Sequence, residues 1–384
     1  MDTDTGLTLL LGAGASVEAR VPTAKEMARE IYKKLRANPL VARAMEVAVA
    51  GIHFRRSAIE AEPFGEVDVE DLYDVLSALA TRNSNILSPF IGSWNQAVTS
   101  AEAEGIRENI DHATEQLRVG VQETLRSRPK SSDVDFRVFG NALHDAFRAI
   151  SGGSAHGAFE SAREMVRQEL IRICWIRDVA YIEYLRPLIA SSKTSPLWIA
   201  SLNYDNTIEL AANAENVQLD LGIRPVSTAA TTGSVIHFND QSPACLAKLH
   251  GSISWRYHAG RVEALARPSL EAAMIFGGRS KLRVDGPYLD LLFAFRSRLE
   301  RTAILNVCGY SFRDTHINHL ILNWLDSDTA RLLRVVDPYL GLEQIASNVR
   351  ASLAEGRTSI NDAALTKRIQ LTNEPAAEWF KHLS

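Results

Sequence analysis

Short apolar segments recur along this chain, and each of them ends at a glycine or a polar residue. The first is Leu7–Leu11, which is followed at once by Gly12. Four later segments behave alike: Pro196–Leu202, Leu246–Leu249, Thr302–Cys308 and Leu332–Val336. Short apolar runs of this kind are typical of parallel strands that are buried on both faces. Because helical patterns alternate with them, the sequence indicates an α/β fold, a parallel sheet with helices on both faces.

The positions of the two patterns divide the chain. The sheet-forming segments fall within 1–65 and 191–345, which we expect to form one Rossmann-like core. The stretch 66–190 is mostly helical in pattern and is predicted to be a large insertion into that core. Residues 346–384 are predicted to be a C-terminal helical tail. The segment 220–245, rich in Ser, Thr, Ala and Gly, is predicted to be a long loop.

Charge and composition exclude several classes of protein. The 384 residues include 42 Lys and Arg against 46 Asp and Glu, a net charge of −4, so we expect no direct sequence-specific binding to nucleic acid. No apolar run approaches the roughly 18 residues that a membrane span needs, and the acidic first residues are unlike a secretory signal. The three cysteines are far apart, which predicts neither a disulfide framework nor a four-cysteine zinc site. We therefore expect a cytoplasmic protein with no zinc and no membrane contact.

The turn after the first predicted strand carries two glycines within five residues: Gly12, Ala13, Gly14, Ala15 and Ser16. Glycines let a backbone approach a pyrophosphate closely, and the start of a following helix offers free N–H groups. Val17 stands where the dinucleotide fingerprint has its third glycine. The motif indicates either a phosphate-binding loop or a tight strand-to-helix turn without a ligand, and the residues alone leave both readings open. A helix is predicted after Thr23, which can cap it.

Two further motifs bring an amide, a carboxylate and an imidazole to strand ends. Asn203 and Asp205 follow the second predicted strand, where they either face a ligand or cap a helix that begins near Thr207. His250 follows the third strand and precedes Gly251. Its imidazole is a candidate general base. A single histidine is also a common structural residue, so this reading has an alternative too.

The remaining motifs follow the fourth and fifth predicted strands. Gly309 and Ser311 form a Gly-x-Ser turn that can hold a ribose or a phosphate, and Asp337 can accept hydrogen bonds from ribose hydroxyls. Asp314 has the position of an ordinary helix cap and is assigned no chemistry. Cys308 is expected to be a buried strand residue. Because ligands of parallel sheets bind outside the carboxyl ends of the strands, these motifs together predict one shared site.

Taken in order, these motifs resemble the sirtuin superfamily, and in particular the sirtuin-like NAD-cleaving branch found among bacterial anti-phage defence proteins. The matching pieces are the glycine turn with Val21-Pro22-Thr23, then Asn203-Tyr204-Asp205, Lys248 through Ser252 with Trp255, and Gly309 through Asp314. The chain lacks the two cysteine pairs of the zinc ribbon of protein-deacylating sirtuins, and Leu202 replaces the glutamine before Asn203. It therefore resembles the branch that has no zinc, and an acyl-lysine channel is not expected.

The resemblance implies an NAD+ glycohydrolase, which cleaves NAD+ into nicotinamide and ADP-ribose. It implies that Asn203 positions the reacting ribose or a water, that His250 acts as the base, and that Asp205 supports the cationic end or orients its neighbours. It also implies residues that hold the pyrophosphate and the adenosine side of NAD: Gly12, Ala13, Gly14, Ala15, Ser16, Thr23, Gly309, Ser311 and Asp337. It implies no metal ligand.

The resemblance also implies a setting for the activity. Proteins of this branch often work as oligomers or with a second protein, so we expect a homo-oligomer and, as a partner, a HerA-type ATPase or a prokaryotic Argonaute. Partner binding or oligomerisation would then activate NAD depletion. Other readings are an NAD- or ADP-ribose-binding regulatory subunit without hydrolysis, an ADP-ribosyl or deacyl transferase, and a nuclease. The missing zinc ligands disfavour deacylation, and the sequence has no clustered carboxylates to support a metal-dependent nuclease.

Overall fold

A computed structural model describes residues 6–59, 66–82, 115, 119, 157–227, 232–258, 261–275, 287–351 and 362–383. The chain divides into two compact units, one made of Met1–Ala24 with Leu170–Ser384 and the other of Lys25–Glu169. Most of the centre of the predicted insertion lies outside the described residues, so its helical character there stays a prediction.

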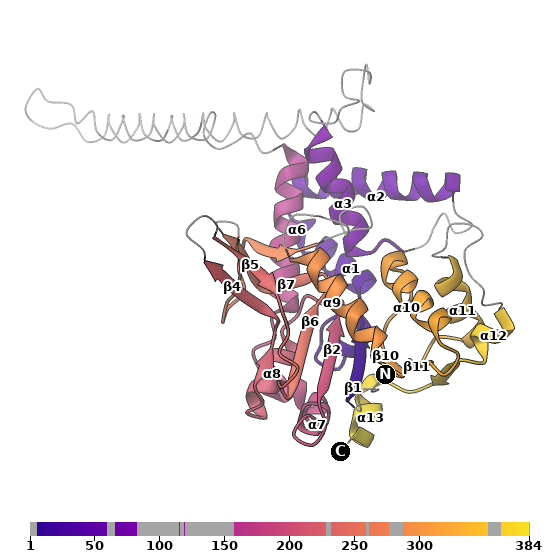
Figure 1. The fold of residues 1–384 in the computed structure, drawn as a ribbon. Coiled ribbons are helices and arrows are strands. Elements are labelled where there is room, and N and C mark those ends of the chain that lie inside the picture. Colours follow the sequence, from indigo (N-terminus) through magenta and orange to yellow (C-terminus); the bar gives the residue numbers. More distant parts are fainter. Residues whose placement is uncertain are drawn as a thin grey trace, which may run out of the picture. The chain divides into compact units, whose positions relative to one another are not determined.

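A seven-stranded sheet forms the centre of the first unit (Figure 1). Its strands, in chain order, are β1 (Leu7–Leu11), β2 (Leu197–Ser201), β3 (Leu219–Asp220), β6 (Ala244–Lys248), β10 (Ile304–Cys308), β11 (Leu332–Val336) and β12 (Ile369–Thr372). Across the sheet the order is β12-β11-β10-β1-β2-β6-β3, and every neighbouring pair is parallel. The five strands predicted from apolar segments are confirmed, and so is the Rossmann-like α/β class.

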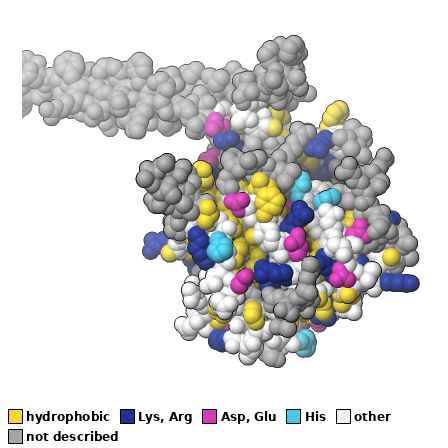
Figure 2. Space-filling model, viewed as in Figure 1, with side chains coloured by type: hydrophobic (Ala, Val, Ile, Leu, Met, Phe, Trp, Pro, Cys, Tyr) yellow, Lys and Arg dark blue, Asp and Glu magenta, His cyan; other side chains and the backbone are white. Residues whose placement is uncertain are grey.

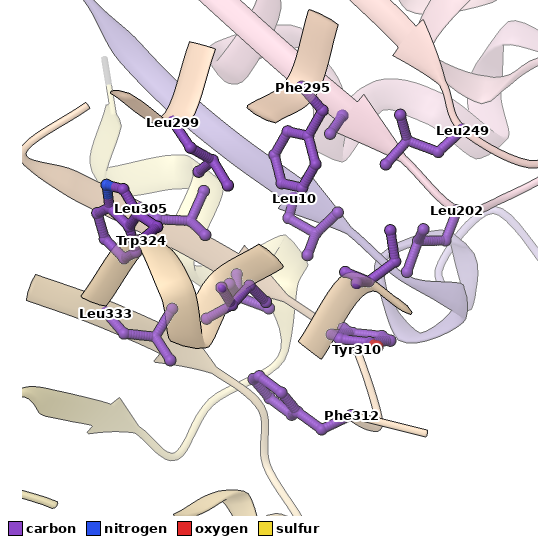
Figure 3. Packing of buried hydrophobic residues seen from close by; sticks show 14 of the residues in the cluster. Leu10, Leu202, Leu249, Phe295, Leu299, Leu305, Tyr310, Phe312, Trp324 and Leu333 are labelled. Carbon is purple, nitrogen blue, oxygen red and sulfur yellow. The ribbon is translucent and has the colours of Figure 1, made fainter. Parts of the chain in front are cut away.

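Helices bury both faces of this sheet. On one face Leu10 of β1 belongs to a hydrophobic cluster that includes residues of α9 (Tyr288–Glu300), α10 (Thr315–Ser327) and α11 (Leu342–Ala351). Figure 3 shows part of this cluster, with strand residues Leu10, Leu305 and Leu333 and helix residues Phe295, Leu299 and Trp324.

On the opposite face Leu9 and Ile199 are also fully buried. Helix α8 (Thr207–Ala214), whose buried Ile208 and Ala211 are outside that cluster, packs with α7 (Arg186–Ser191) and with the 3-10 helix η5 (Val179–Leu185). Burial on both faces explains why the central strands are apolar without alternation.

The segment 220–245, predicted to be a loop, forms strands instead, so that prediction was wrong. β4 (Ile223–Ser227) and β5 (Thr232–Ile236) pair antiparallel as a two-stranded ribbon. Such a ribbon satisfies backbone hydrogen bonds between its own strands and needs no long apolar run, which is the signal by which strands were sought. Next to it along the chain, β7 (Gly251–His258) pairs antiparallel with β8 (Arg261–Ala264) and β9 (Ala272–Met274).

The tail predicted to be helical also supplies a strand. β12 extends the sheet by pairing with β11, and short helices flank it: α12 (Asp362–Thr366), α13 (Ala376–Phe380) and η6 (Lys381–Leu383). Polar and apolar residues alternate in Ile369–Thr372, so it does not stand out as an apolar segment.

The second unit contains α1 (Ala24–Leu35), α2 (Pro39–Ile59), α3 (Val69–Ala80) and the first part of α6 (Ala158–Cys174). Helix α1 begins after Thr23 as predicted. Asp68 caps α3, because its side chain accepts a hydrogen bond from the Asp71 amide at 2.8 Å. In the described part of the chain, every helix is too short or too polar to cross a membrane.

Candidate functional site

The predicted site residues lie along one edge of the sheet, after five adjacent strands. The chain runs from β1 through β2 to β6 on one side of β1 and then places β10 and β11 on the other side. The strand order therefore reverses at β1, and crevices outside such reversals are where α/β sheets bind ligands. Gly12, Asn203, His250, Gly309 and Asp337 follow these five strands, and because all five are parallel, their carboxyl ends meet at this edge.

The glycine turns after β1 and β10 pack directly against each other. The Gly12 amide donates to Cys308 O at 3.0 Å and the Gly14 amide to Gly309 O at 2.9 Å. A Cβ on Gly12 would lie 2.5 Å from Gly309 O, and Gly309 itself has φ +62°, a left-handed conformation that favours glycine. The glycines are therefore required by this close backbone contact, whether or not a phosphate also approaches.

Asn203 links the end of β2 to the glycine turn. Its Nδ2 donates to Gly12 O at 2.9 Å and to the Ser16 hydroxyl at 3.0 Å, while its backbone amide donates to the Ser201 hydroxyl at 3.1 Å. A carbonyl oxygen such as Gly12 O only accepts hydrogen bonds, so the side-chain NH2 must be the group that faces it. Both N–H groups are then used, and Oδ1 of this half-buried side chain is the atom available to a ligand.

Asp205 binds the first residue of α8, although the N-cap position itself is Asn206. Oδ1 of Asp205 accepts from the Thr207 amide at 3.0 Å and from the Thr207 hydroxyl at 2.6 Å, at the start of α8. The residue is buried, and its backbone oxygen accepts from Lys248 Nζ. The direct role of Asp205 toward a ligand stays a prediction.

Lys248, the last residue of β6, is buried beneath the loop that carries Asn203. Besides the Asp205 carbonyl, its Nζ contacts Tyr204 O at 3.4 Å and Glu209 Oε1 of α8 at 3.0 Å. The Lys248 side chain is 1% exposed, against 20% for Glu209, whose Oε2 is buried without a hydrogen-bond partner in the described structure. A buried ammonium so placed fixes the position of the Asn203–Asp205 loop.

His250 forms a buried pair with a residue that the sequence did not assign to the site. Its Nε2 lies 3.0 Å from Oδ2 of Asp314, and the two side chains are only 7% and 4% exposed. Its Nδ1 is also buried and has no hydrogen-bond partner in the described structure. The Tyr204 ring lies near it, with ring centroids 6.4 Å apart. An imidazole held at one nitrogen and unpaired at the other suits a general base.

Two tyrosines of η5 support the glycine turn from the side. The Tyr184 hydroxyl donates to Ala15 O at 2.7 Å, and burial raises the pKa of that phenol, so it remains a donor. Arg20 donates to the Tyr181 hydroxyl at 2.9 Å and lies 4.3 Å from the centre of the Tyr181 ring. These contacts join segments that are distant in sequence, so no local sequence pattern could have predicted them.

The remaining predicted binding residues are less closely tied to this centre. Ser311 is exposed, and its backbone oxygen accepts from the Asn348 side chain at 3.4 Å. Asp337 is half-buried, and its Oδ1 accepts from the amides of Tyr339 and Leu340 at 2.8 and 3.0 Å. Ala13 stays in the turn with Gly12, and Thr23 lies directly before α1. Their roles toward NAD stay predictions.

The cysteines are structural in character. Cys174, Cys245 and Cys308 are all free and buried. Burial raises the pKa of the Cys245 thiol to about 12, and it raises the pKa of Cys308 well above its ordinary value. Cys308 is therefore a buried strand residue, as predicted. Among the described residues, His, Cys, Asp and Glu nowhere form a group of three that could hold a metal ion.

A hollow of about 560 Å³ lies away from the strand-end edge, beside β3, β4 and β8. β3 pairs with the amino-terminal residues of β6, at the opposite end of that strand from Lys248. The lining charges Arg224 and Asp220 pair with each other at 2.7 Å. Because it lies at the opposite end of β6, this hollow does not belong to the candidate site.

Basic and acidic side chains are interspersed on the face of the molecule that Figure 2 shows.

Comparison with known proteins shows a likeness over part of the chain. A comparison with curated proteins gave no match. The family model described as "SIR2-like domain" matches residues 198–348, a range that starts in β2, ends in α11 and contains Asn203, His250 and Asp314. SIR2-like domains are associated with NAD, so the match points to NAD-related activity. Over these residues the chain is therefore similar to SIR2-like domains, and the Rossmann-like sheet is consistent with that likeness.

Proposed function

We propose that this protein is an NAD+ glycohydrolase whose site lies at the carboxyl ends of β1, β2, β6 and β10. One observation carries the proposal: Asn203 binds the glycine turn through both of its N–H groups, and its Oδ1 is left at the edge where His250 follows the next strand. An amide acceptor can position a water or a ribose hydroxyl, and an imidazole from the neighbouring strand can take its proton, which are two ways to assist cleavage of a ribosyl bond by water.

In this hydrolysis nicotinamide is a good leaving group. Nicotinamide is already cationic in NAD+, so when the bond between ribose C1′ and the pyridine nitrogen breaks, its electron pair neutralises that nitrogen. A water oxygen forms the new bond to C1′, and His250 takes a proton from that water. Asn203 Oδ1 accepts a hydrogen bond from the water or from a ribose hydroxyl and so fixes its position. The products are nicotinamide, ADP-ribose and a proton.

NAD fits the residues present in part. The buried, unpaired Nδ1 of His250 is the kind of polar atom that a ligand hydroxyl or a water would satisfy. The glycines are occupied with each other, so they support a pyrophosphate only through the backbone of the turn that also holds Ala13, Ala15 and Ser16. Gly309, Ser311 and Asp337 are proposed to contact the adenosine side.

The test is nicotinamide and ADP-ribose release from NAD+ by the purified full chain. We expect Asn203→Ala and His250→Ala to lower release about 100-fold or more. Asn213→Ala and His258→Ala change the same residue types at exposed positions and should release product at the wild-type rate. Equal release by the wild type and both site variants would discard this site. NAD binding without release would favour the regulatory-subunit alternative, and label transfer to protein would favour a transferase.

We further propose that the activity serves anti-phage defence and is activated by assembly or by a partner. The resemblance to NAD-cleaving defence proteins supports this. The chain should therefore be assayed alone and with the product of a neighbouring gene, while light scattering measures the mass of each sample. We expect an assembly larger than one chain to form and release to rise with it. Unchanged release by a formed assembly would contradict activation by assembly.

A further inference from the structure

The His250–Asp314 pair indicates which nitrogen of the imidazole carries the proton, because a carboxylate and an imidazole have different hydrogen-bonding capacities. An ionised carboxylate only accepts. At 3.0 Å, Oδ2 of Asp314 therefore requires a proton on Nε2 of His250. A neutral imidazole carries one proton, so its lone pair is then on Nδ1.

Asp314 is held so firmly that it imposes this choice on the histidine. Its other oxygen, Oδ1, accepts from the amides of His316 and Ile317 at 3.1 and 3.4 Å and so caps α10. The start of a 13-residue helix favours an anionic side chain there. Each carboxylate oxygen thus has its own partner, one on the helix and one on the imidazole.

The backbone of Asp314 is fixed as well. Its amide donates to the Tyr310 hydroxyl at 3.1 Å, and that hydroxyl donates to Oδ1 of Asn318 at 2.9 Å. Asn318 Nδ2 in turn donates to Phe312 O at 2.8 Å. This buried network closes the loop that follows Gly309 and leaves the carboxylate little freedom to turn away from His250.

We propose that Asp314 is a positioning residue that holds His250 as the Nε2–H tautomer, so that Nδ1 is the atom that takes the proton. Nδ1 is buried and lacks a hydrogen-bond partner in the described structure, which is the state expected of an acceptor waiting for a ligand. The tautomer assignment stands on the geometry alone, whereas the base role of Nδ1 rests on the proposed hydrolysis.

Asp314→Asn tests this assignment with little change of shape. Asparagine is as good a cap as aspartate, so α10 should keep its start and thermal unfolding should stay close to that of the wild type. The asparagine NH2 can donate to Nε2, which then becomes an acceptor, and the imidazole proton moves to Nδ1. Asp178→Asn is the matched control, because Asp178 also caps a helix, with the Ala180 amide at 2.9 Å, but lies at an exposed site.

The readout is 15N NMR of the full chain labelled at its histidine imidazoles, with the His250 signals identified by their loss in His250→Gln. We expect protonated Nε2 and bare Nδ1 in the wild type and in Asp178→Asn, and the reverse in Asp314→Asn. NAD+ cleavage by Asp314→Asn should fall about 100-fold or more in kcat, with a smaller change in KM. Asp178→Asn should retain wild-type kinetics.

Two results would overturn the proposal. One is a wild-type His250 that carries its proton on Nδ1, or one on each nitrogen, at the pH of the assay. The other is an Asp314→Asn variant that keeps both the wild-type tautomer and the wild-type kcat. If no variant and no wild type releases nicotinamide but the tautomer reverses as expected, the proposed hydrolysis fails and the positioning role stands.

Discussion

The two sides of the candidate site are held together by different groups, backbone atoms on one side and buried polar side chains on the other. On the side of β1 and β10, backbone packs on backbone, because Gly12, Gly14 and Gly309 leave no room for a Cβ between the turns. On the side of β2 and β6, buried polar side chains hold the loops: Lys248 binds the Asn203–Asp205 loop, and Asp314, which reaches across from the segment after β10, pairs with His250.

This difference separates features that packing explains from features that ask for a ligand. On the glycine side, the backbone groups of the two turns form hydrogen bonds with each other, so packing alone explains their close contact. The side-chain side ends in two buried polar atoms without hydrogen-bond partners in the described structure, His250 Nδ1 and Glu209 Oε2. Unpaired buried polar atoms are uncommon in native proteins and usually mark a function or an ordered water. The evidence for a ligand is therefore stronger on the side of β2 and β6 than on the side of the glycine motif.

The largest effect on stability is expected on the side-chain side. Lys248→Met keeps an unbranched side chain but leaves the Glu209 carboxylate and two loop carbonyls without their ammonium. Removing one member of a buried ion pair costs about 3–5 kcal/mol of unfolding free energy. Urea unfolding followed by circular dichroism would measure it, and NAD+ cleavage should fall because the loop that bears Asn203 loses its support.

The double variant Lys248→Met with Glu209→Met is the control for that experiment. Removing both charges should restore much of the unfolding free energy, because an apolar pair of similar volume carries no uncompensated charge. A single Lys248→Met variant as stable as the wild type would show that the ion pair does not hold the loop.

A smaller loss is expected on the backbone side. In Gly12→Ala the added Cβ would lie 2.5 Å from Gly309 O and 2.7 Å from Tyr310 Cα, and neither backbone atom can move without shifting its turn. Overpacking of this kind costs about 1–3 kcal/mol. Gly341→Ala is the matched control in the same unit, because its Cβ would meet open space. Equal stability of both variants in urea would mean that the two turns are not in the close contact described.

The sequence predicted what local patterns encode. β1 and β11 were predicted to the residue, because a short apolar run followed by glycine or Asp-Pro is a signal contained in a few neighbours. The placement of the motifs on one edge followed from parallel pairing alone. The ribbon of β4 and β5 and the edge strand β12 escaped because short or partly polar strands take their stability from their partners.

Side-chain partnerships were harder to predict for a related reason. Asp314 looked complete as a helix cap, and nothing near it in sequence indicates that its second oxygen meets His250. Lys248 is a charged residue at the end of an apolar strand. Its burial depends on the ion pair with Glu209 of α8, a residue that lies 39 positions away in the sequence. Such pairings depend on contacts between distant segments, which one sequence does not display.

The smallest effect is expected at Asp337, farthest along the edge from His250. Its Oδ1 accepts two amides of its own turn, so Oδ2 is the oxygen left to meet a ribose hydroxyl. Asp337→Asn keeps an acceptor for the turn and removes the charge, so stability should change by less than about 1 kcal/mol. KM for NAD+ should rise about tenfold or less, with kcat nearly unchanged, because a remote contact contributes equally to ground-state and transition-state binding. An unchanged KM would remove Asp337 from the adenosine side and confine the recognition of NAD to the β1, β2, β6 and β10 ends.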